Sequence, residues 1–458
     1  MCRNSFSGNI PRSLFALPSL LELRLSYNQF NGTFQLDNFQ SLPNLTFLSL
    51  SGNSLLVDVG NVNSISYGGL TLKELGLASC NLSSFPDFIK HLDLEELGLA
   101  NNSIAGEVPS WDWGKRLWYL DLSFNLLTNL QKPYHIPASL RYLRLASNQL
   151  KGELQMSIPL QSELSKLFLA NNTFSGSIPI SLCNATHLDF LDMSRNKLSG
   201  SIPPCLLENI SVLDLSRNNI SGSIPLRSLE NISVLDLSQN NISGNIPDTF
   251  SMVCELGYLD LNNNALEGKI PKSIGSCMWL QYMNVGNNMI NDTFPCMLSP
   301  GLIALVLHSN RFHGDLRCHG NWPSLKVLDV SSNHFSGSLE SMDFSSWTAM
   351  VLPSGGDFGG TFGGKLDVAL IIKGKMLEFH KIWSDFSTID LSSNSFYGKI
   401  PNAIGDLNYL HQINFSHNAL NGSIPKSFGR LSNLESLDLS VNQLAGRIPE
   451  ELGGLTFL

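Results

Sequence analysis

Asparagine recurs along this chain at a nearly fixed spacing, and this recurrence limits the fold more than any other feature. The segments LWYLDLSFN (117–125), LDFLDMSRN (188–196) and LESLDLSVN (434–442) share the pattern L-x-x-L-x-L-x-x-N. Its final position falls at residues 4, 28, 53, 80, 102, 125, 148, 172, 196, 218, 240, 264, 288, 310, 333, 394, 418 and 442, and only Cys80 is not Asn. Such self-similarity predicts a stack of repeated coils.

The spacing of the apolar residues indicates how each coil folds. Alternate leucines of a short strand point into the interior, while the residues between them face outward on a shared parallel sheet. Because one coil cannot bury its leucines alone, neighbouring coils must stack. The Asn side chain has donor and acceptor groups that suit backbone partners where the chain leaves the strand. Asn28 and Asn240 are therefore predicted to be structural.

Most repeats continue after the Asn with L-x-G-x-I-P, as in LSGSIP (198–203) and LNGSIP (420–425). Gly permits the turn, and Pro closes a second short extended segment. With this phrase the chain resembles the plant-specific subclass of leucine-rich repeats over nearly its whole length. The resemblance implies an α/β-type solenoid, a right-handed superhelix of about 18 repeats with a parallel sheet on its concave face and second short strands.

One interruption breaks the recurrence. Asn333 and Asn394 are 61 residues apart, whereas the other steps are 22 to 27 residues. Long stretches without repeat character are commonly functional loops. The predicted organisation is a repeat array over 1–337, an inserted island over 338–385 and terminal repeats over 386–458. Both ends of the sequence fall within a repeat, so we expect a piece of a longer protein.

A glycine-rich stretch inside the island approaches a nucleotide-binding motif, Gly359-x-x-x-x-Gly364-Lys365. A phosphate-binding loop needs Ser or Thr after the Lys, a strand before it and a helix after it. Leu366 follows Lys365, and the next segment, DVALIIKGK, has the composition of a strand. An inserted loop with a strand fits better than a nucleotide site, and no cofactor is expected.

Six cysteines fall in adjacent repeats at nearly equal distances before the final Asn: Cys183 and Cys205, Cys254 and Cys277, Cys296 and Cys318. Equal register in stacked coils places two residues about 5 Å apart, within reach of a disulfide bond. Three disulfides between neighbouring repeats are expected, most firmly 183–205. Other pairings, and six buried free thiols, stay open. No metal site is expected, because His313, Cys318 and His319 lack zinc-type spacing.

Sequons for N-glycosylation are numerous, and they favour an extracellular chain together with the cysteines. They lie at Asn31, Asn44, Asn81, Asn101, Asn171, Asn184, Asn209, Asn219, Asn231, Asn241, Asn291, Asn414 and Asn421. Apolar residues make up 43% of the chain and charged residues 15%, which excludes a disordered tail. The net charge of −9 argues against a nucleic-acid partner. No apolar run is long enough to cross a membrane.

No catalytic constellation is found. A column of aspartates follows the L-D-L-S phrase: Asp121, Asp192, Asp214, Asp236, Asp260, Asp329, Asp390 and Asp438. Paired carboxylates can perform acid–base chemistry, but the repeat phrase itself explains this column. Binding should use outward strand positions that depart from the phrase, and four adjacent repeats depart together: Trp118, Tyr119, Phe124, Arg141, Tyr142, Arg144, Lys166, Phe168 and Phe190. Aromatic and Arg side chains are common binding hot spots; random surface variation or packing under a glycan is the alternative.

Longer motifs resemble those of the plant receptor-like proteins, namely LGLASCNLSSFPDF (75–88) and KGKMLEFHKIWSDFSTIDLSSNSFYGKIP (373–401). These are cell-surface receptors with a leucine-rich ectodomain and no kinase. The resemblance implies a partner-binding island at Lys373, Gly374, Glu378, Phe379 and Lys381 that faces a co-receptor kinase. It also implies the extracellular side of the plasma membrane, with attachment only through a segment beyond this sequence.

The predicted function is a non-enzymatic ectodomain that senses a microbial pattern or effector and recruits a partner receptor kinase with leucine-rich repeats for defence signalling. One alternative is a developmental receptor-like protein that binds a peptide ligand. Another is a secreted polygalacturonase-inhibitor-like protein, although such inhibitors lack an island. An enzyme is a third class, disfavoured because no site is recognised.

Overall fold

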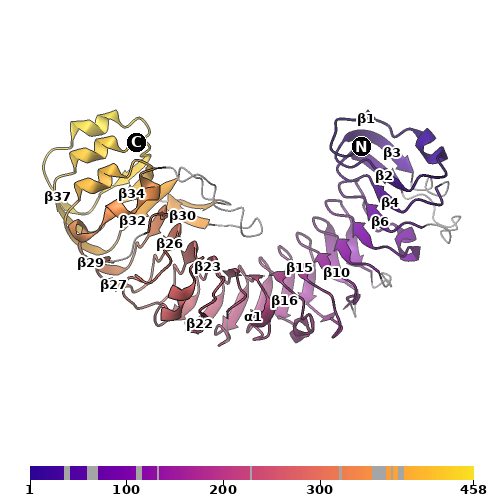
Figure 1. Cartoon of the computed structure of the whole chain (residues 1–458), viewed down its shortest axis with the longest axis horizontal. Helices are drawn as coiled ribbons and strands as arrows, with labels where there is room; N and C mark the ends of the chain where they lie inside the picture. The colour runs from indigo at the N-terminus through magenta and orange to yellow at the C-terminus, as the bar shows by residue number, and fades with distance from the viewer. Residues whose placement is uncertain are drawn as a thin grey trace. The chain divides into compact units, whose positions relative to one another are not determined.

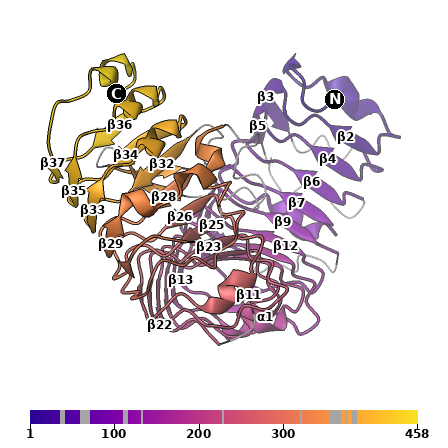
Figure 2. The same ribbon diagram turned by 60° about the vertical axis from the view of Figure 1, so that its left-hand side comes forward.

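The computed structural model describes residues 1–35, 42–58, 71–109, 116–131, 134–226, 229–318, 322–352, 368–372, 375–379 and 386–458. The chain divides into two compact units. The first comprises Met1–Ile210 with Asp214–Asn219, and the second Ser211–Leu213 with Ile220–Leu458. Each unit is a stack of similar coils, and the strands of the first unit form successive rungs in Figure 2.

The first unit holds a main ladder of parallel three-residue strands. In register, Leu97 pairs with Leu120 and Leu120 with Leu143, so the central leucines of neighbouring strands meet in the interior. The strands are β2 (Glu22–Arg24), β4 (Phe47–Ser49), β6 (Glu74–Gly76), β7 (Glu96–Gly98), β9 (Tyr119–Asp121), β12 (Tyr142–Arg144), β15 (Lys166–Phe168) and β17 (Phe190–Asp192). β19 (Val212–Asp214) crosses the boundary between the units.

The second unit repeats this ladder, with Leu259, Met283 and Leu305 as successive buried centres. Its strands are β21 (Val234–Asp236), β23 (Tyr258–Asp260), β25 (Tyr282–Asn284), β26 (Ala304–Val306), β28 (Val327–Asp329), β32 (Ser387–Asp390), β34 (Leu410–Asn414) and β36 (Ser436–Asp438). β28 pairs directly with β32 although the island separates them in sequence. The predicted leucine-rich repeat solenoid with a parallel sheet is confirmed (Figure 1).

Second strands follow most of the turns, as the L-x-G-x-I-P phrase predicts. In the first unit they are β1 (Ser7–Gly8), β3 (Gln29–Gln35), β5 (Ser54–Asp58), β8 (Ala105–Val108), β10 (Leu126–Leu130), β11 (Tyr134–His135), β13 (Lys151–Glu153), β14 (Met156–Ser157), β16 (Thr173–Ser177) and β18 (Lys197–Gly200). β20 (Asn219–Gly222) begins at the boundary, and the second unit adds β22 (Asn241–Asn245), β24 (Ala265–Glu267), β27 (His313–Gly314), β29 (His334–Ser338), β33 (Ser395–Lys399), β35 (Ala419–Gly422) and β37 (Gln443–Leu444).

Short helical turns close the coils, and several begin directly after the Pro of the repeat. The first unit contains η1 (Arg12–Ala16), η4 (Asp87–His91), η5 (Ile180–Asn184) and α1 (Leu206–Asn209). The second contains η6 (Lys272–Ser276), η7 (Leu339–Ser341), η8 (Phe344–Ser346), η9 (Thr348–Met350), η10 (Asn402–Asp406), η11 (Lys426–Arg430) and η12 (Glu450–Gly454). In the described part of the chain, no helix has the length and apolar character needed to cross a membrane.

The recurring Asn ties each coil to its neighbours. Asn125 Nδ2 donates to the carbonyl oxygens of Leu122 at 3.1 Å and Leu99 at 3.0 Å, and its Oδ1 accepts from the backbone N–H of Ile104 at 3.0 Å. Asn28 and Asn240 donate to their own turns in the same way. These side chains satisfy backbone groups that would otherwise be buried without partners, so their predicted structural role is confirmed.

The packed coil extends past residue 337, where the sequence placed the start of the island. Residues 339–350 form η7, η8 and η9, and the side chains of Phe344, Trp347 and Met350 are buried. They occupy the place that the short turns take in other coils. Farther on, β30 (Val368–Ile372) and β31 (Lys375–Phe379) pair as an antiparallel hairpin, which includes the strand expected in LDVALII.

Three disulfide bonds join neighbouring coils: Cys183–Cys205, Cys254–Cys277 and Cys296–Cys318, with Cα–Cα distances of 5.7, 4.8 and 5.4 Å. Cys318 is thus unavailable as a metal ligand, and His319 lies outside the described residues. Across the described ranges, no cluster of three His, Cys, Asp or Glu side chains is arranged to hold a metal ion. Cys2 is free and exposed, and Cys80 is free and buried.

Candidate functional site

The outward face of the main ladder differs between the two units. In the second unit its apolar side chains form a buried cluster, in which Tyr258 stacks on Tyr282 at 4.5 Å between ring centroids. Tyr282 and Val306 are completely buried. In the first unit the corresponding side chains of β9, β12 and β15 are only half-buried. A ligand can therefore reach this face in the first unit.

Aromatic rings continue across three strands of this accessible face and end at Phe190 on the fourth strand, where the side chain is buried. The Trp118 ring lies 5.9 Å from that of Tyr119 and 5.8 Å from that of Tyr142. Two strands farther on, the rings of Phe168 and Phe190 lie 4.6 Å apart. The repeat brings these residues together, because their strands pair in register from β9 to β17. We call Trp118, Tyr119, Arg141, Tyr142, Arg144, Lys166, Phe168 and Phe190 the aromatic patch.

Cations lie against these rings. The Arg144 guanidinium is centred 4.3 Å from the Phe168 ring, and the Lys166 ammonium is 5.7 Å from the Tyr142 ring. Both distances allow a cation–π interaction. The Arg144 Nε is buried and makes no hydrogen bond. The patch therefore combines apolar surface with positive charge, a mixture common at binding hot spots.

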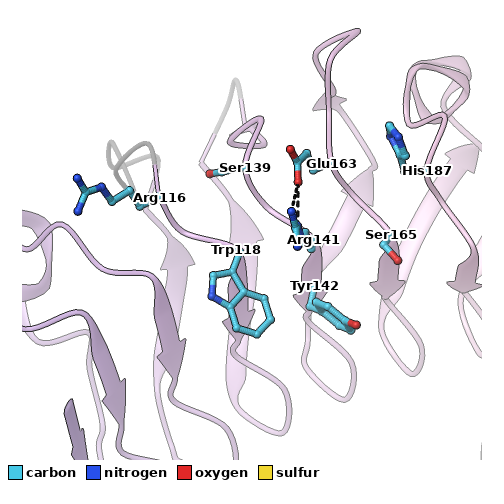
Figure 3. Close-up of a pocket in the computed structure, with 8 residues that line it drawn as sticks. All are labelled: Arg116, Trp118, Ser139, Arg141, Tyr142, Glu163, Ser165 and His187. Carbon is cyan, nitrogen blue, oxygen red and sulfur yellow. Dashed lines mark hydrogen bonds and ion pairs between the residues drawn. The ribbon is translucent and has the colours of Figure 1, made fainter. Parts of the chain in front are cut away.

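An open hollow of about 950 Å³ adjoins the patch (Figure 3). It is lined by Arg116, Trp118, Ser139, Arg141, Tyr142, Glu163, Ser165 and His187. On its wall, Arg141 donates to the Glu163 carboxylate from Nε at 2.8 Å and from Nη2 at 2.6 Å. The hollow is large enough for several side chains of a ligand, and its polar groups can orient them.

The sequence identified only part of this hollow. Trp118 and Arg141 lie seven residues before their ladder Asn, and Tyr142 lies six before. The missed residues Arg116, Ser139, Glu163 and His187 all lie nine before, on an outward row that precedes the strand. Their equal register was the signal that could have revealed them. Ser165, also missed, is at the position of Trp118 and Arg141.

One predicted binding residue lies apart from the others. Phe124 follows the far end of β9, in a turn where its backbone has a left-handed φ of 55°. Its side chain is 59% exposed, and the ring contacts that unite the patch involve other residues. We therefore leave Phe124 out of the candidate site.

The carboxylates of the aspartate column are used in hydrogen bonds within their own turns, which indicates a structural role. Asp121 accepts hydrogen bonds from the backbone N–H of Ser123 at 3.0 Å and from its Oγ at 2.6 Å, and the same arrangement recurs along the column. Asp121 also accepts from the Tyr119 hydroxyl at 3.1 Å. Burial, followed by the Asp121 charge, raises the pKa of Tyr119, so this phenol stays protonated.

Other predicted sites are described less fully. Glu378 and Phe379 lie on β31, where only the backbone is described, and Lys373, Gly374 and Lys381 lie outside the described residues. The motif around Gly359, Gly364 and Lys365 also lies outside them. Among the sequons, Asn414 is half-buried on β34 and donates to the Asp390 carboxylate at 3.0 Å, which makes it a poor glycan acceptor.

Comparison with known proteins places this arrangement in a class. Leucine rich repeat family models match residues 386–444 and, with a shorter repeat, 163–185, 187–208, 209–227, 231–252, 255–277 and 324–345. The crystal structure of a TDR receptor superposes with a TM-score of 0.74 at 27% identity, covering 96% of this chain and 71% of that one. The Arabidopsis receptor kinase HAESA, in complex with the peptide hormone IDA and the co-receptor SERK1, gives 0.70 at 27% identity, covering 99% and 79%.

The relatives found by sequence belong to one family within this class, the receptor-like proteins. Receptor like protein 27 from Arabidopsis thaliana is 38% identical over 428 residues, which are 89% of this chain and 50% of the relative. Receptor-like protein 54 from the same plant is 37% identical, over 90% and 50%. The chain belongs to the plant leucine-rich repeat receptor-like proteins, and it corresponds to receptor ectodomain. It spans about half the length of the curated relatives it matches.

Proposed function

We propose that the aromatic patch and its hollow form the ligand-recognition surface of a receptor-like protein that acts without catalysing a reaction. The observation that carries this proposal is the continuous run of rings and cations on β9, β12, β15 and β17, on a face where the repeat usually supplies Asp, Ser or Asn. Exposed aromatic and Arg residues gathered at one place mark protein interfaces. The ligand class is a protein or peptide, as HAESA is a receptor for a peptide hormone.

A triple variant tests this surface. Trp118, Arg144 and Phe168 are replaced by Ala in the full-length parent, and the affinity for its ligand is measured. We expect a loss of at least a hundredfold, because truncating hot-spot residues costs about 2 kcal/mol or more each. Replacing Phe124 by Ala is the matched control, since this exposed ring lies outside the patch. Unchanged affinity of the triple variant would remove the patch from the account.

We further propose that ligand binding recruits a co-receptor kinase through the island and the terminal repeats. HAESA forms a complex with SERK1, and the island motif at Lys373, Gly374, Glu378, Phe379 and Lys381 is the family feature that supports a similar role. A defence role, with a microbial pattern or effector as ligand, is our first choice on the resemblance of the island motif to that of plant receptor-like proteins. A developmental role with a peptide ligand is the second candidate, which the peptide-hormone receptors of the same fold favour.

Replacement of the island tests recruitment. The variant should exchange residues 354–384 for a Gly–Ser linker and keep residues up to 352, because Trp347 and Met350 are buried in the coil. Ligand affinity of the patch and co-immunoprecipitation with the kinase are then measured in the full-length parent. We expect the complex with the kinase to be lost. Survival of that complex would exclude the island from recruitment.

A further inference from the structure

Two cations of the aromatic patch have no carboxylate partner in the described part of the first unit. Arg24, Lys73, Arg116 and Arg141 each pair with an acidic side chain there. The described contacts of the Arg144 and Lys166 cations are with aromatic rings, those of Phe168 and Tyr142 respectively. Positive charge is thus left available on two neighbouring strands, in a chain whose net charge is −9.

The Arg144 side chain also has a hydrogen-bond donor without an acceptor. Its Nε is buried and donates to no acceptor. Leaving a buried donor without a partner is unfavourable, so the Arg144 side chain gains by turning toward an acceptor that a ligand brings. Arginine also presents a planar set of N–H groups that matches the two oxygens of a carboxylate.

The charge on the ladder face changes from one strand to the next. β6 and β7 present Glu74 and Glu96, which pair in register. The next strands present the rings of Tyr119 and Tyr142 and then Arg144 and Lys166. Asp121 pairs in register with Arg144, but its carboxylate accepts hydrogen bonds from Tyr119 and Ser123. An acidic ligand is therefore repelled at one side of the rings and attracted at the other, which fixes the direction in which it lies.

We infer that the ligand of this face is a peptide segment with an acidic side chain next to an aromatic or aliphatic one. The carboxylate lies between Arg144 and Lys166, and the apolar side chain packs on Trp118 and Tyr142. This inference rests on the proposed function of the aromatic patch.

A peptide fits the site better than a smaller or more highly charged anion. The hollow of about 950 Å³ beside the cations would stay unfilled around a single inorganic anion. Its wall carries the hydroxyls of Ser139 and Ser165 and the His187 ring, which can bond to peptide groups. A polyanion such as a nucleic acid would also meet Glu74 and Glu96 on the neighbouring strands.

Selection from a random peptide library tests the inference and does not require the natural ligand. The immobilised full chain is panned against displayed random dodecapeptides, in parallel with a Trp118→Ala variant that removes the apolar platform. Peptides retained by the wild type and lost on the variant define the patch-dependent set. We expect Asp and Glu to be enriched at least twofold in that set relative to the starting library, next to an aromatic or aliphatic residue.

A variant without the two cations then distinguishes electrostatic attraction of the peptide from the fit of its shape to the patch. On Arg144→Gln with Lys166→Gln, a synthetic peptide from the set should bind at least tenfold more weakly, and its affinity should no longer fall with added salt. Lys197→Gln is the matched control, because this exposed lysine lies on β18 in the second row of strands. The thermal unfolding temperature of each variant must match that of the wild type. If the double variant does not fold, Lys166→Gln alone is used in its place.

The outcomes separate the inference from the function beneath it. A patch-dependent set without acidic enrichment, or an acidic peptide that binds the double variant as tightly as the wild type, would overturn the inference and leave the patch as a binding surface. Tighter binding of a DNA oligonucleotide than of the selected peptide would overturn the peptide class. A library from which no peptide depends on Trp118 would contradict both the inference and the proposed function.

Discussion

At the scale of single residues, the recurring Asn does the work of a backbone partner, and one position shows what happens without it. Cys80 occupies the ladder position between Asn53 and Asn102. Its thiol lies 3.7 Å from the Leu50 carbonyl oxygen and 3.5 Å from that of Ala78. A thiol is a weak donor, so these carbonyls are bonded less well than in neighbouring coils, and Cys80 has no oxygen that could accept from a backbone N–H.

Replacing Cys80 by Asn should therefore stabilise the first unit. The new amide can donate to both carbonyls and accept from a backbone N–H, which we expect to raise the free energy of unfolding by about 1 kcal/mol. Chemical denaturation measures the difference. The converse change, Asn125→Ala, should destabilise by about 1–3 kcal/mol because it leaves buried backbone groups without partners. A Cys80→Asn chain that is no more stable than the wild type would contradict this role of the ladder.

At the scale of elements, disulfides pin particular pairs of coils. Cys254–Cys277 closes a loop with a sequence separation of 23 residues, and both side chains are buried. Removing both cysteines by substitution with Ala should lower the free energy of unfolding by about 3 kcal/mol, chiefly because the unfolded chain regains freedom. Chemical denaturation of the oxidised protein measures the loss. Cys2→Ala is the control, since Cys2 is free and exposed, and an equal loss in that variant would refute the assignment.

Elements also show how far the sequence alone could reach. The strands, the turns and the neighbouring-coil cysteine pairs follow from register, because every coil places equal positions side by side. Register also predicts the positions of Trp118, Arg141 and Tyr142 in the site. It predicts those of Glu163 and His187 as well, through the outward row nine residues before the Asn. The island boundary was harder, because η7 to η9 pack as normal turns without the usual phrase. Burial of Tyr282 and Val306 depends on contacts among side chains of neighbouring coils, which no single coil encodes.

At the scale of the whole molecule, buried carboxylates make stability depend on pH. Asp329 and Asp390 pair in register on β28 and β32. Burial and then the neighbouring Asp329 charge raise the pKa of Asp390 from its ordinary value of 3.8 to about 7. Between these two values the folded chain holds a proton that the unfolded chain has released. Stability is therefore greatest at the acidic end of this window and falls as the pH rises through about 7.

We expect the free energy of unfolding to be about 2 kcal/mol higher at pH 5 than at pH 7.5, because a shift of one pKa unit corresponds to about 1.4 kcal/mol. Asp329→Asn removes the neighbouring charge, so it should flatten this dependence. Asp438→Asn is the matched control, since this member of the column is exposed. Denaturation curves across the pH range measure all three chains. A wild type that grows more stable from pH 5 to 7.5 would contradict the assignment.

The claim on which the function rests is that a ligand lies on the ladder face of the first unit. A structure of the full-length parent with its ligand bound tests it most directly. We expect ligand atoms within about 4 Å of Trp118, Tyr142 and Arg144, with an acidic group at the Arg144 guanidinium. A bound ligand that leaves these three side chains uncovered, on the second strands or on the short turns, would contradict it.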